Sequence, residues 1–193
     1  MSARLDIWLI LGCWIVFAAY WAIAAIGAKP NLGVRGWRRE GGLRLALIVL
    51  TLLLLRVPSV REALRQLQRD GAGIAVFTGA AGVALCALGM TLAIWARIHL
   101  GRNWGVPMSR KEDPELVTTG PYGFIRHPIY LGILLAMLGS TLGASIFWLL
   151  PLILFGGYFV YSARNEEILM LAQFPQQYSA YRQRTKMLLP FLF

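Results

Sequence analysis

Long apolar segments alternate with short polar ones along most of the 193-residue chain. The first apolar segment, residues 7–26, contains no charged side chain. A helix of that length spans about 30 Å, which matches the hydrocarbon core of a bilayer. Further apolar segments cover residues 41–57, 74–96 and 129–161. This pattern predicts an all-α, multi-pass membrane protein, because backbone exposed to lipid must satisfy its own hydrogen bonds.

The apolar segment 129–161 is too long for one span, since a single helix of that length would measure about 50 Å. A break at Gly143, Ala144 and Ser145 would fold this segment into a tight helical hairpin. The pattern therefore predicts five transmembrane helices, of which the last two form the hairpin. From residue 164 onward, charges alternate with apolar and aromatic residues. This alternation predicts a cytoplasmic C-terminal helix that continues from the last span and ends at Pro190.

The N-terminal spans carry structural signals and no candidate chemistry. A cleaved signal peptide is the alternative for the first span, but the apolar run is longer than the usual 7–15 residues or so. Asp6 also stands where a signal peptide has basic residues. Arg44 lies near the start of the second span, where its side chain could extend to the interface. Small residues of the third span predict close approach of another helix: Ala72, Gly79, Ala80, Gly82 and Ala84.

The composition excludes several classes of protein. Charged residues make up 15% of the chain, against roughly 25% in a soluble domain, which argues against a soluble enzyme or a disordered tail. The net charge of +10 does not indicate nucleic-acid binding, because the basic residues punctuate the apolar segments instead of clustering. Cys13 and Cys86 lie inside apolar runs, and His99 and His127 are far apart. The sequence therefore predicts neither a disulfide framework nor a metal site.

The basic residues also predict an orientation. With five spans, fourteen of the 19 Lys and Arg residues fall on one side of the membrane and five on the other. The positive-inside rule makes the fourteen-charge side cytoplasmic, so the third loop and the C-terminus are cytoplasmic and the N-terminus is opposite. We expect one integrated domain, in which residues 1–96 form three spans and residues 97–193 form the polar loop, the hairpin and the C-terminal helix.

A polar motif surrounds His127 at the start of the hairpin. Pro128 suits the first position of a helix, which would place His127 at the N-cap. The free N–H groups of a helix start favour a carboxylate or phosphate, and Arg126, Tyr122 and Tyr130 add a charge, hydroxyls and aromatic faces. The alternative is an ordinary interfacial anchor, because Arg, His and Tyr are common at a membrane boundary.

Glu166 and Glu167 form an acidic pair at the end of the last predicted span. Acids are unfavourable at a helix C-terminus, and charge is costly at this depth. A solvated helix end, partly neutralised by Arg164, is the alternative to a site that receives a ligand ammonium. The hairpin returns this pair to the membrane face of His127. We therefore take His127, Glu166 and Glu167 as the candidate catalytic residues.

The C-terminal half of the chain resembles the membrane methyltransferase superfamily of isoprenylcysteine carboxyl methyltransferases and phospholipid N-methyltransferases. The resemblance covers roughly residues 95–193 and is most specific where Arg-His-Pro-Ile-Tyr is followed by a hairpin and Glu-Glu. The matching segments are residues 100–104, 116–122, 126–130 and 166–167, together with Phe174, Tyr178, Tyr181 and the closing pair Leu189 and Pro190.

This resemblance implies S-adenosylmethionine as the cofactor, held by the third loop, the start of the fourth span and the C-terminal helix. It implies methyl transfer to a lipophilic acceptor, a carboxylate, thiol or amine, that enters sideways from the bilayer. The positions that match cofactor contacts are Pro114, Glu115, Leu116, Val117, Tyr122, His127, Pro128, Ile129, Tyr130 and Glu166.

The sequence departs from the family at one acceptor position. Isoprenylcysteine enzymes resemble one another in placing an Arg four residues before the first Glu of the pair. Here that position is Ser162, and Arg164 is about 200° around the helix from it. A prenylcysteine carboxylate is therefore not favoured, and an amine, a thiol or a different lipid acid stays open. Candidate acceptor contacts are Ser162, Arg164 and Trp104.

Two other functions remain open at this point. Membrane sterol reductases have a similar C-terminal hairpin pocket but use NADPH. A non-catalytic membrane scaffold would use the same His and Glu residues as interface anchors. Nicotinamide binding would favour the reductase, and the absence of saturable cofactor binding would favour the scaffold. We expect a lipid or lipid-linked partner and no nucleic acid.

Overall fold

The computed structural model describes residues 3–26, 31–32, 34–70, 75–101, 110–111 and 115–189. This part of the chain contains seven α-helices: α1 (Ala3–Ile26), α2 (Val34–Leu54), α3 (Pro58–Asp70), α4 (Ala75–Leu100), α5 (Pro128–Gly143), α6 (Leu149–Gln173) and α7 (Pro175–Arg184). Strand β1 (Asn31–Leu32) pairs antiparallel with β2 (Arg110–Lys111). Two short 3₁₀ helices, η3 (Gly120–Gly123) and η4 (Ile146–Trp148), precede α5 and α6. The fold is therefore helical, as predicted.

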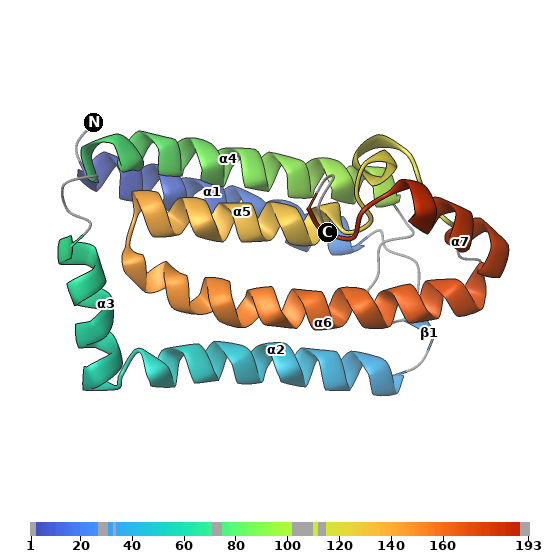
Figure 1. Cartoon of the computed structure of the whole chain (residues 1–193), viewed down its shortest axis with the longest axis horizontal. Coiled ribbons are helices and arrows are strands. Elements are labelled where there is room, and N and C mark those ends of the chain that lie inside the picture. The colour runs from blue at the N-terminus through green and yellow to red at the C-terminus, as the bar shows by residue number, and fades with distance from the viewer. Residues whose placement is uncertain are drawn as a thin grey trace.

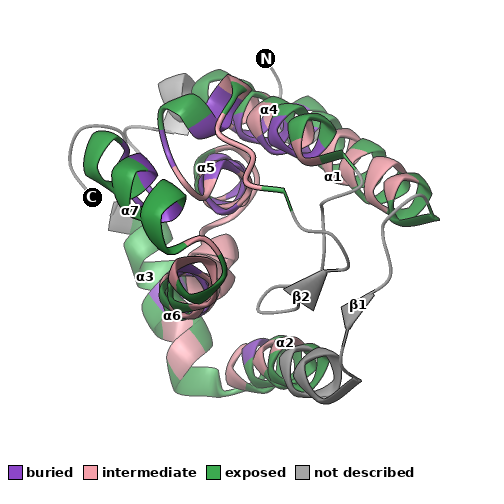
Figure 2. Ribbon diagram, turned by 90° about the vertical axis from the view of Figure 1, so that its right-hand side faces the viewer, coloured by how far each residue is buried: buried purple, intermediate pink, exposed green. Residues whose placement is uncertain are grey.

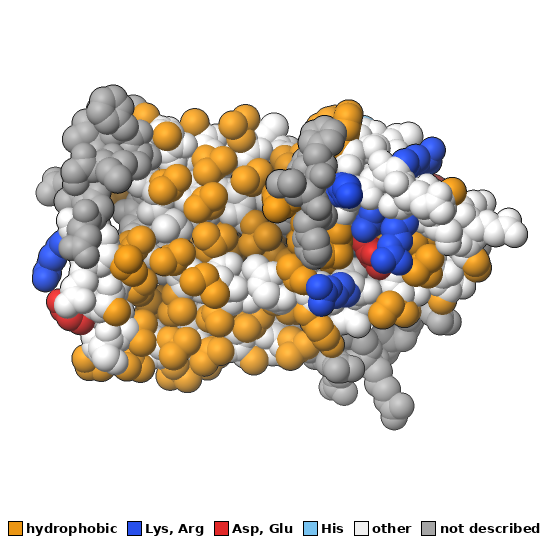
Figure 3. Space-filling model, in the orientation of Figure 1, with side chains coloured by type: hydrophobic (Ala, Val, Ile, Leu, Met, Phe, Trp, Pro, Cys, Tyr) orange, Lys and Arg blue, Asp and Glu red, His pale blue; other side chains and the backbone are white. Residues whose placement is uncertain are grey.

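Helices α1, α2, α4, α5 and α6 run along the long axis of the molecule, and α3 lies across one end (Figure 1). Within the residues that the structure describes, three segments are long and apolar enough to cross a membrane: Leu5–Ile26, Gly79–Leu100 and Ile146–Gln173. The segments Gly41–Leu54 and Pro58–Arg69 meet at 79° and together could form a fourth. Hydrophobic side chains cover the middle of the face in Figure 3, and charged side chains lie toward its two ends. These features fit a multi-pass integral membrane protein.

Helix α3 was not among the elements predicted from the sequence. Pro58 occupies its first position, which suits a proline because that N–H has no partner in a helix. Leu64 is buried, while Glu62, Arg65 and Arg69 form exposed ion pairs on the outer face. The helix is amphipathic and crosses the end of the bundle opposite α7 (Figure 1). Its spacing of apolar residues was a usable signal, but the basic residues made the segment resemble a loop.

Helices α4 and α5 pack with their backbones in contact. A Cβ added at Gly132 would lie 2.5 Å from the carbonyl oxygen of Gly89, and one at Gly139 would lie 2.5 Å from that of Gly82. Such close approach needs small residues on both helices. The prediction was right for Gly79 and Gly82, which are buried, but wrong for Ala80 and Ala84, which are exposed, while Ala72 lies outside the described residues. The contact fixes the start of α5 against α4.

The predicted hairpin is confirmed. Helix α5 ends at Gly143, and α6 begins at Leu149 after η4. The hydroxyl of Ser145 accepts a hydrogen bond of 3.3 Å from the N–H of Phe147, which starts the new turn. Figure 2 shows that the buried residues gather on α5 and on the sides of α4 and α6 that face it.

The predicted continuous C-terminal helix is wrong, because the chain breaks between α6 and α7. Phe174 leaves the helical conformation, with φ −131° and ψ 65°. Pro175 follows it, and a proline disfavours the helical conformation of the preceding residue and lacks an N–H. Helix α7 then folds back toward α5 (Figure 1) and ends at Arg184, whereas Pro190 lies outside the described residues.

Arg44 does more than extend toward the interface. Its Nε donates a hydrogen bond of 2.9 Å to the hydroxyl of Tyr158 on α6, and its guanidinium lies 5.9 Å from the centre of that ring. Leu47, one turn along α2, packs against the cluster that contains Tyr158. These contacts attach α2 to α6.

Candidate functional site

His127 stands at the N-terminus of α5, as predicted. It is the N-cap residue, and Pro128 takes the first helical position. The backbone N–H groups of Arg126 and His127 donate to the carbonyl oxygens of Lys186 (2.9 Å) and Met187 (3.1 Å). The chain after α7 therefore pairs with the segment before α5 and fixes the backbone of His127.

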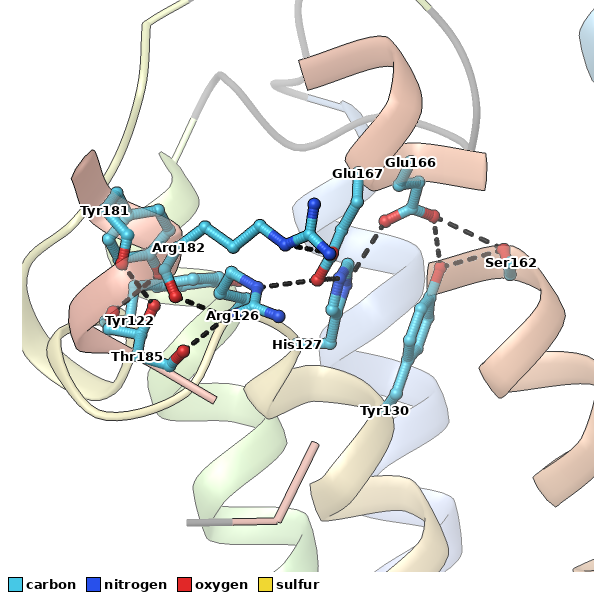
Figure 4. Close-up of polar contacts among 10 residues, drawn as sticks. All are labelled: Tyr122, Arg126, His127, Tyr130, Ser162, Glu166, Glu167, Tyr181, Arg182 and Thr185. Carbon is cyan, nitrogen blue, oxygen red and sulfur yellow. Dashed lines mark hydrogen bonds and ion pairs between the residues drawn. The ribbon is translucent and has the colours of Figure 1, made fainter. Parts of the chain in front are cut away.

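The imidazole of His127 lies between the two acidic side chains of α6 (Figure 4). Its Nδ1 is 3.5 Å from Oε2 of Glu166, and its Nε2 is 3.6 Å from Oε1 of Glu167. The imidazole side chain is 9% exposed. The hairpin thus brings these three groups together, as the sequence predicted.

Glu167 is held by two arginines. Arg126 Nε donates a hydrogen bond of 2.6 Å to Oε1 of Glu167, and Arg182 Nε lies 3.6 Å from Oε2. The side chains of Arg126 and Glu167 are each 8% exposed. Arg126 Nη1 also donates to the carbonyl oxygens of Thr185 and Arg182. One buried network therefore links the loop before α5, the end of α6 and the end of α7.

Glu166 makes a different set of contacts. Its Oε1 accepts hydrogen bonds from the hydroxyl of Tyr130 and, at 3.3 Å, from that of Ser162. The ring of Tyr130 stacks between His127 and Phe159, with centroid distances of 5.5 and 4.6 Å. The side chain of Glu166 is 24% exposed, three times the fraction of Glu167. The two adjacent acids therefore differ in environment: Glu167 is buried against cations, whereas Glu166 is partly exposed.

The electrostatic environment favours the charged form of His127. Burial by itself lowers the pKa of His127, but the interactions with Glu166 and Glu167 outweigh burial and raise the pKa above its ordinary value of 6.5. Within the described part of the chain, Nε2 has no hydrogen-bond partner, because 3.6 Å is too long for one. In its charged form the imidazole would therefore have an Nε2–H that is free to donate to a further acceptor.

The loop that leads to the site is held by α7. The hydroxyl of Tyr181 donates a hydrogen bond of 2.6 Å to the carbonyl oxygen of Tyr122 in η3. Burial raises the pKa of Tyr181 to about 12, so this hydroxyl keeps its proton. Gly120 has φ +58°, and a Cβ there would overlap the ring of His99, so only glycine fits this turn.

Comparison with known proteins identifies the family. The sequence profile described as "Phospholipid methyltransferase" matches residues 77–177, which is more than half of the chain. The chain belongs to the phospholipid methyltransferase family. The matched residues run from α4 through α5 and α6 into α7, and they include His127, Glu166 and Glu167.

Three curated relatives resemble this phospholipid methyltransferase family protein. Protein-S-isoprenylcysteine O-methyltransferase of Schizosaccharomyces pombe is 31% identical over 112 residues, which cover 56% of this chain and 47% of the relative. The protein of the same name from Tribolium castaneum is 30% identical over 115 residues, 58% of this chain and 41% of the relative. The nickel-cobalt-cadmium resistance protein NccN of Alcaligenes xylosoxydans xylosoxydans is 31% identical over 106 residues, which cover 53% of this chain and 47% of the relative. The chain thus matches less than half the length of each.

The structure distributes the other predicted site residues of this family member over several environments. Pro128 and Tyr130 are buried in the first turn of α5, Ile129 beside them is partly buried, and Tyr122 is buried in η3. Of the remaining predicted positions, Leu116 and Val117 are partly buried and Ser162 is fully buried. Glu115 and Arg164 are exposed. Pro114 and Trp104 lie outside the described residues.

Sequence reasoning missed Arg182 and Thr185, which complete the network around Glu167. Both residues lie beyond the segment that the family profile matches. A buried acid next to a membrane requires a cation nearby, so a basic partner was foreseeable. The sequence does not distinguish Arg182 from Arg184 or Lys186, because all three lie within five residues, at the end of α7 and just after it.

Proposed function

We propose that this protein transfers the methyl group of S-adenosylmethionine to a lipophilic acceptor in the membrane. One observation carries the proposal: a buried His127 with a spare donor and a partly exposed Glu166 lie side by side where α5 begins and α6 ends. This pair offers one positive and one negative group at the same site, in a chain that belongs to the phospholipid methyltransferase family.

The charges of these residues fit the ends of S-adenosylmethionine. A charged imidazole and the free N–H groups in the first turn of α5 suit the carboxylate of its methionine part. The accessible carboxylate of Glu166 suits the ammonium group. The cofactor would supply a methyl group already activated on a sulfonium, so the protein has mainly to orient two partners and exclude water.

The other residues of the network act as positioning groups in this proposal. Glu167 holds the imidazole of His127 and is itself held by Arg126 and Arg182. Tyr130 and Ser162 hold the carboxylate of Glu166. Ser162 is fully buried in this role, so we propose that it shapes the cofactor side of the site and does not contact the acceptor.

The proton requirement depends on the acceptor. A carboxylate or thiolate acceptor needs no general base, whereas an amine has to lose a proton. The raised pKa of His127 favours its charged form, which has no free lone pair to accept this proton. We therefore propose that Glu166 is the proton acceptor if the acceptor is an amine.

For the membrane arrangement we propose five spans, with the site on the cytoplasmic face and residues 1–96 and 97–193 packed as one domain. The common direction of α1, α2, α4, α5 and α6 supports five spans (Figure 1), although α5 has only 16 residues, about 24 Å. The excess of basic residues beside the site supports its cytoplasmic location. A lipid-linked acceptor fits this location and fits two relatives named protein-S-isoprenylcysteine O-methyltransferases.

Calorimetry on the purified full chain in detergent tests the proposal. We expect saturable binding of S-adenosylmethionine, a large loss of affinity in His127→Asn and Glu166→Gln, and wild-type affinity in the matched control Glu62→Gln on α3. Incubation with labelled methyl donor and a total lipid extract, followed by mass spectrometry, would identify the product. The proposal would be refuted if the protein bound NADPH in place of S-adenosylmethionine. It would also be refuted if both site variants bound S-adenosylmethionine as tightly as the wild type.

A further inference from the structure

A strongly basic cavity adjoins the network around Glu167. Its volume is about 490 Å³, and its walls come from the end of α6, the end of α7, the chain after α7 and the loop before α5. The charged side chains that line it are Arg126, Arg164, Arg182, Arg184, Lys186 and Glu167. Five cations and one carboxylate thus line this cavity in the described part of the chain.

This cavity has more positive charge than its own acid neutralises. Glu167 already interacts with Arg126, Arg182 and His127. Among the described residues, Arg164, Arg184 and Lys186 have no carboxylate partner, and all three are exposed. Cations gathered in a concave surface raise the local concentration of anions. The cavity is therefore suited to an anionic group with several oxygen acceptors, such as a phosphate.

An exposed apolar surface adjoins the same cavity. Tyr161, Arg164 and Ile168 are spaced three and four residues apart on α6, so they share one face of the helix. Tyr161 is 42% exposed and Ile168 is 64% exposed. In Figure 3 the basic side chains near α7 border the hydrophobic surface of the bundle. A ligand at this place meets cations at one end and apolar side chains at the other.

We propose that this cavity binds the headgroup phosphate of an anionic phospholipid. The phosphate lies among Arg164, Arg184 and Lys186, and an acyl chain runs along Tyr161 and Ile168. The apolar surface favours a lipid over a soluble anion, because a free phosphate gains nothing from it. Clusters of four to eight basic residues beside a membrane helix attract anionic lipids in this way. The bound lipid would hold α7, and with it the network around Glu167, against the membrane surface.

The test uses the full chain in phosphatidylcholine nanodiscs into which phosphatidylglycerol is titrated, with bound lipid read by native mass spectrometry. The variant Arg184→Gln/Lys186→Gln removes two exposed charges. Each basic residue near an anionic surface contributes roughly a fivefold change in affinity, so the double variant should bind about 30-fold more weakly. Arg56→Gln/Arg61→Gln, two exposed charges at the opposite end of the molecule, is the matched control and should bind like the wild type.

Two further measurements separate the possible ligands. Ile168→Ser removes the apolar contact and should weaken phosphatidylglycerol binding while all charges remain. Inorganic phosphate should not displace the lipid at millimolar concentration. Equal affinity of the wild type for both phospholipids, equal losses in the two double variants, or displacement by inorganic phosphate would overturn the proposal. Calorimetry with S-adenosylmethionine distinguishes this failure from failure of the methyltransferase proposal, because the cofactor residues are unchanged in these variants.

Discussion

Replacement of Glu167 by Gln tests how the site is held together. The substitution keeps the shape of the side chain but leaves Arg126 buried without its carboxylate. Loss of one partner of a buried ion pair costs about 3–5 kcal/mol, because the other charge stays out of water. Arg126 keeps hydrogen bonds to two carbonyl oxygens at the end of α7, so we expect about 3 kcal/mol. For a chain of this size that loss lowers the unfolding midpoint by about 6–12 °C.

Glu62→Gln is the matched control, since Glu62 pairs with Arg65 and Arg69 at 3.9 and 3.5 Å on the exposed face of α3. An exposed pair contributes at most about 1 kcal/mol. The assay is thermal unfolding of both variants in one detergent. A double-mutant cycle of Glu167→Gln with Arg126→Met should give a coupling of about 1–3 kcal/mol. If Glu167→Gln unfolds like Glu62→Gln, or if the cycle is additive, the network does not hold the site and the reasoning fails.

Three further perturbations have defined outcomes. Because folding raises the pKa of His127, the charged imidazole stabilises the fold fully below pH 6.5, and this contribution is lost as the pH rises through the raised pKa. The unfolding midpoint of the wild type should therefore fall toward that of His127→Asn in alkaline buffer. A difference between the two midpoints that does not depend on pH would contradict this prediction. Gly132→Ala forces a methyl group into the backbone of α4 and should lower the free energy of unfolding by about 1–3 kcal/mol or more, whereas the control Gly157→Ala meets open space and should not destabilise the protein. Similar unfolding midpoints for the two variants would exclude the close contact between α4 and α5. Arg44→Met removes the hydrogen bond to Tyr158 and should lower the free energy of unfolding by about 1–2 kcal/mol, and Tyr158→Phe should reproduce most of this loss. If the losses in the double variant are additive, the two side chains are not coupled and the prediction is wrong.

The sequence by itself determined the features that depend on neighbouring residues. The break at Gly143, Ala144 and Ser145 follows from the length of an apolar run against the thickness of a bilayer. The N-cap position of His127 follows from Pro128, whose ring fixes φ and lacks an N–H. The proximity of the imidazole to the acidic pair then follows from the hairpin alone. Each of these rests on local geometry, which residue order specifies.

Only the tertiary structure decided which side chains of the site contact one another. Arg126 and Glu167 are 41 residues apart in the chain, and several basic residues were equally available as partners by composition. The break before Pro175 turns α7 back, and that turn selects Arg182 for Glu167 and leaves Arg184 and Lys186 in the basic cavity. The same packing separates two adjacent glutamates into one enclosed and one accessible group. Helical periodicity specifies the face of a side chain, but its partner depends on how the helices are placed in space.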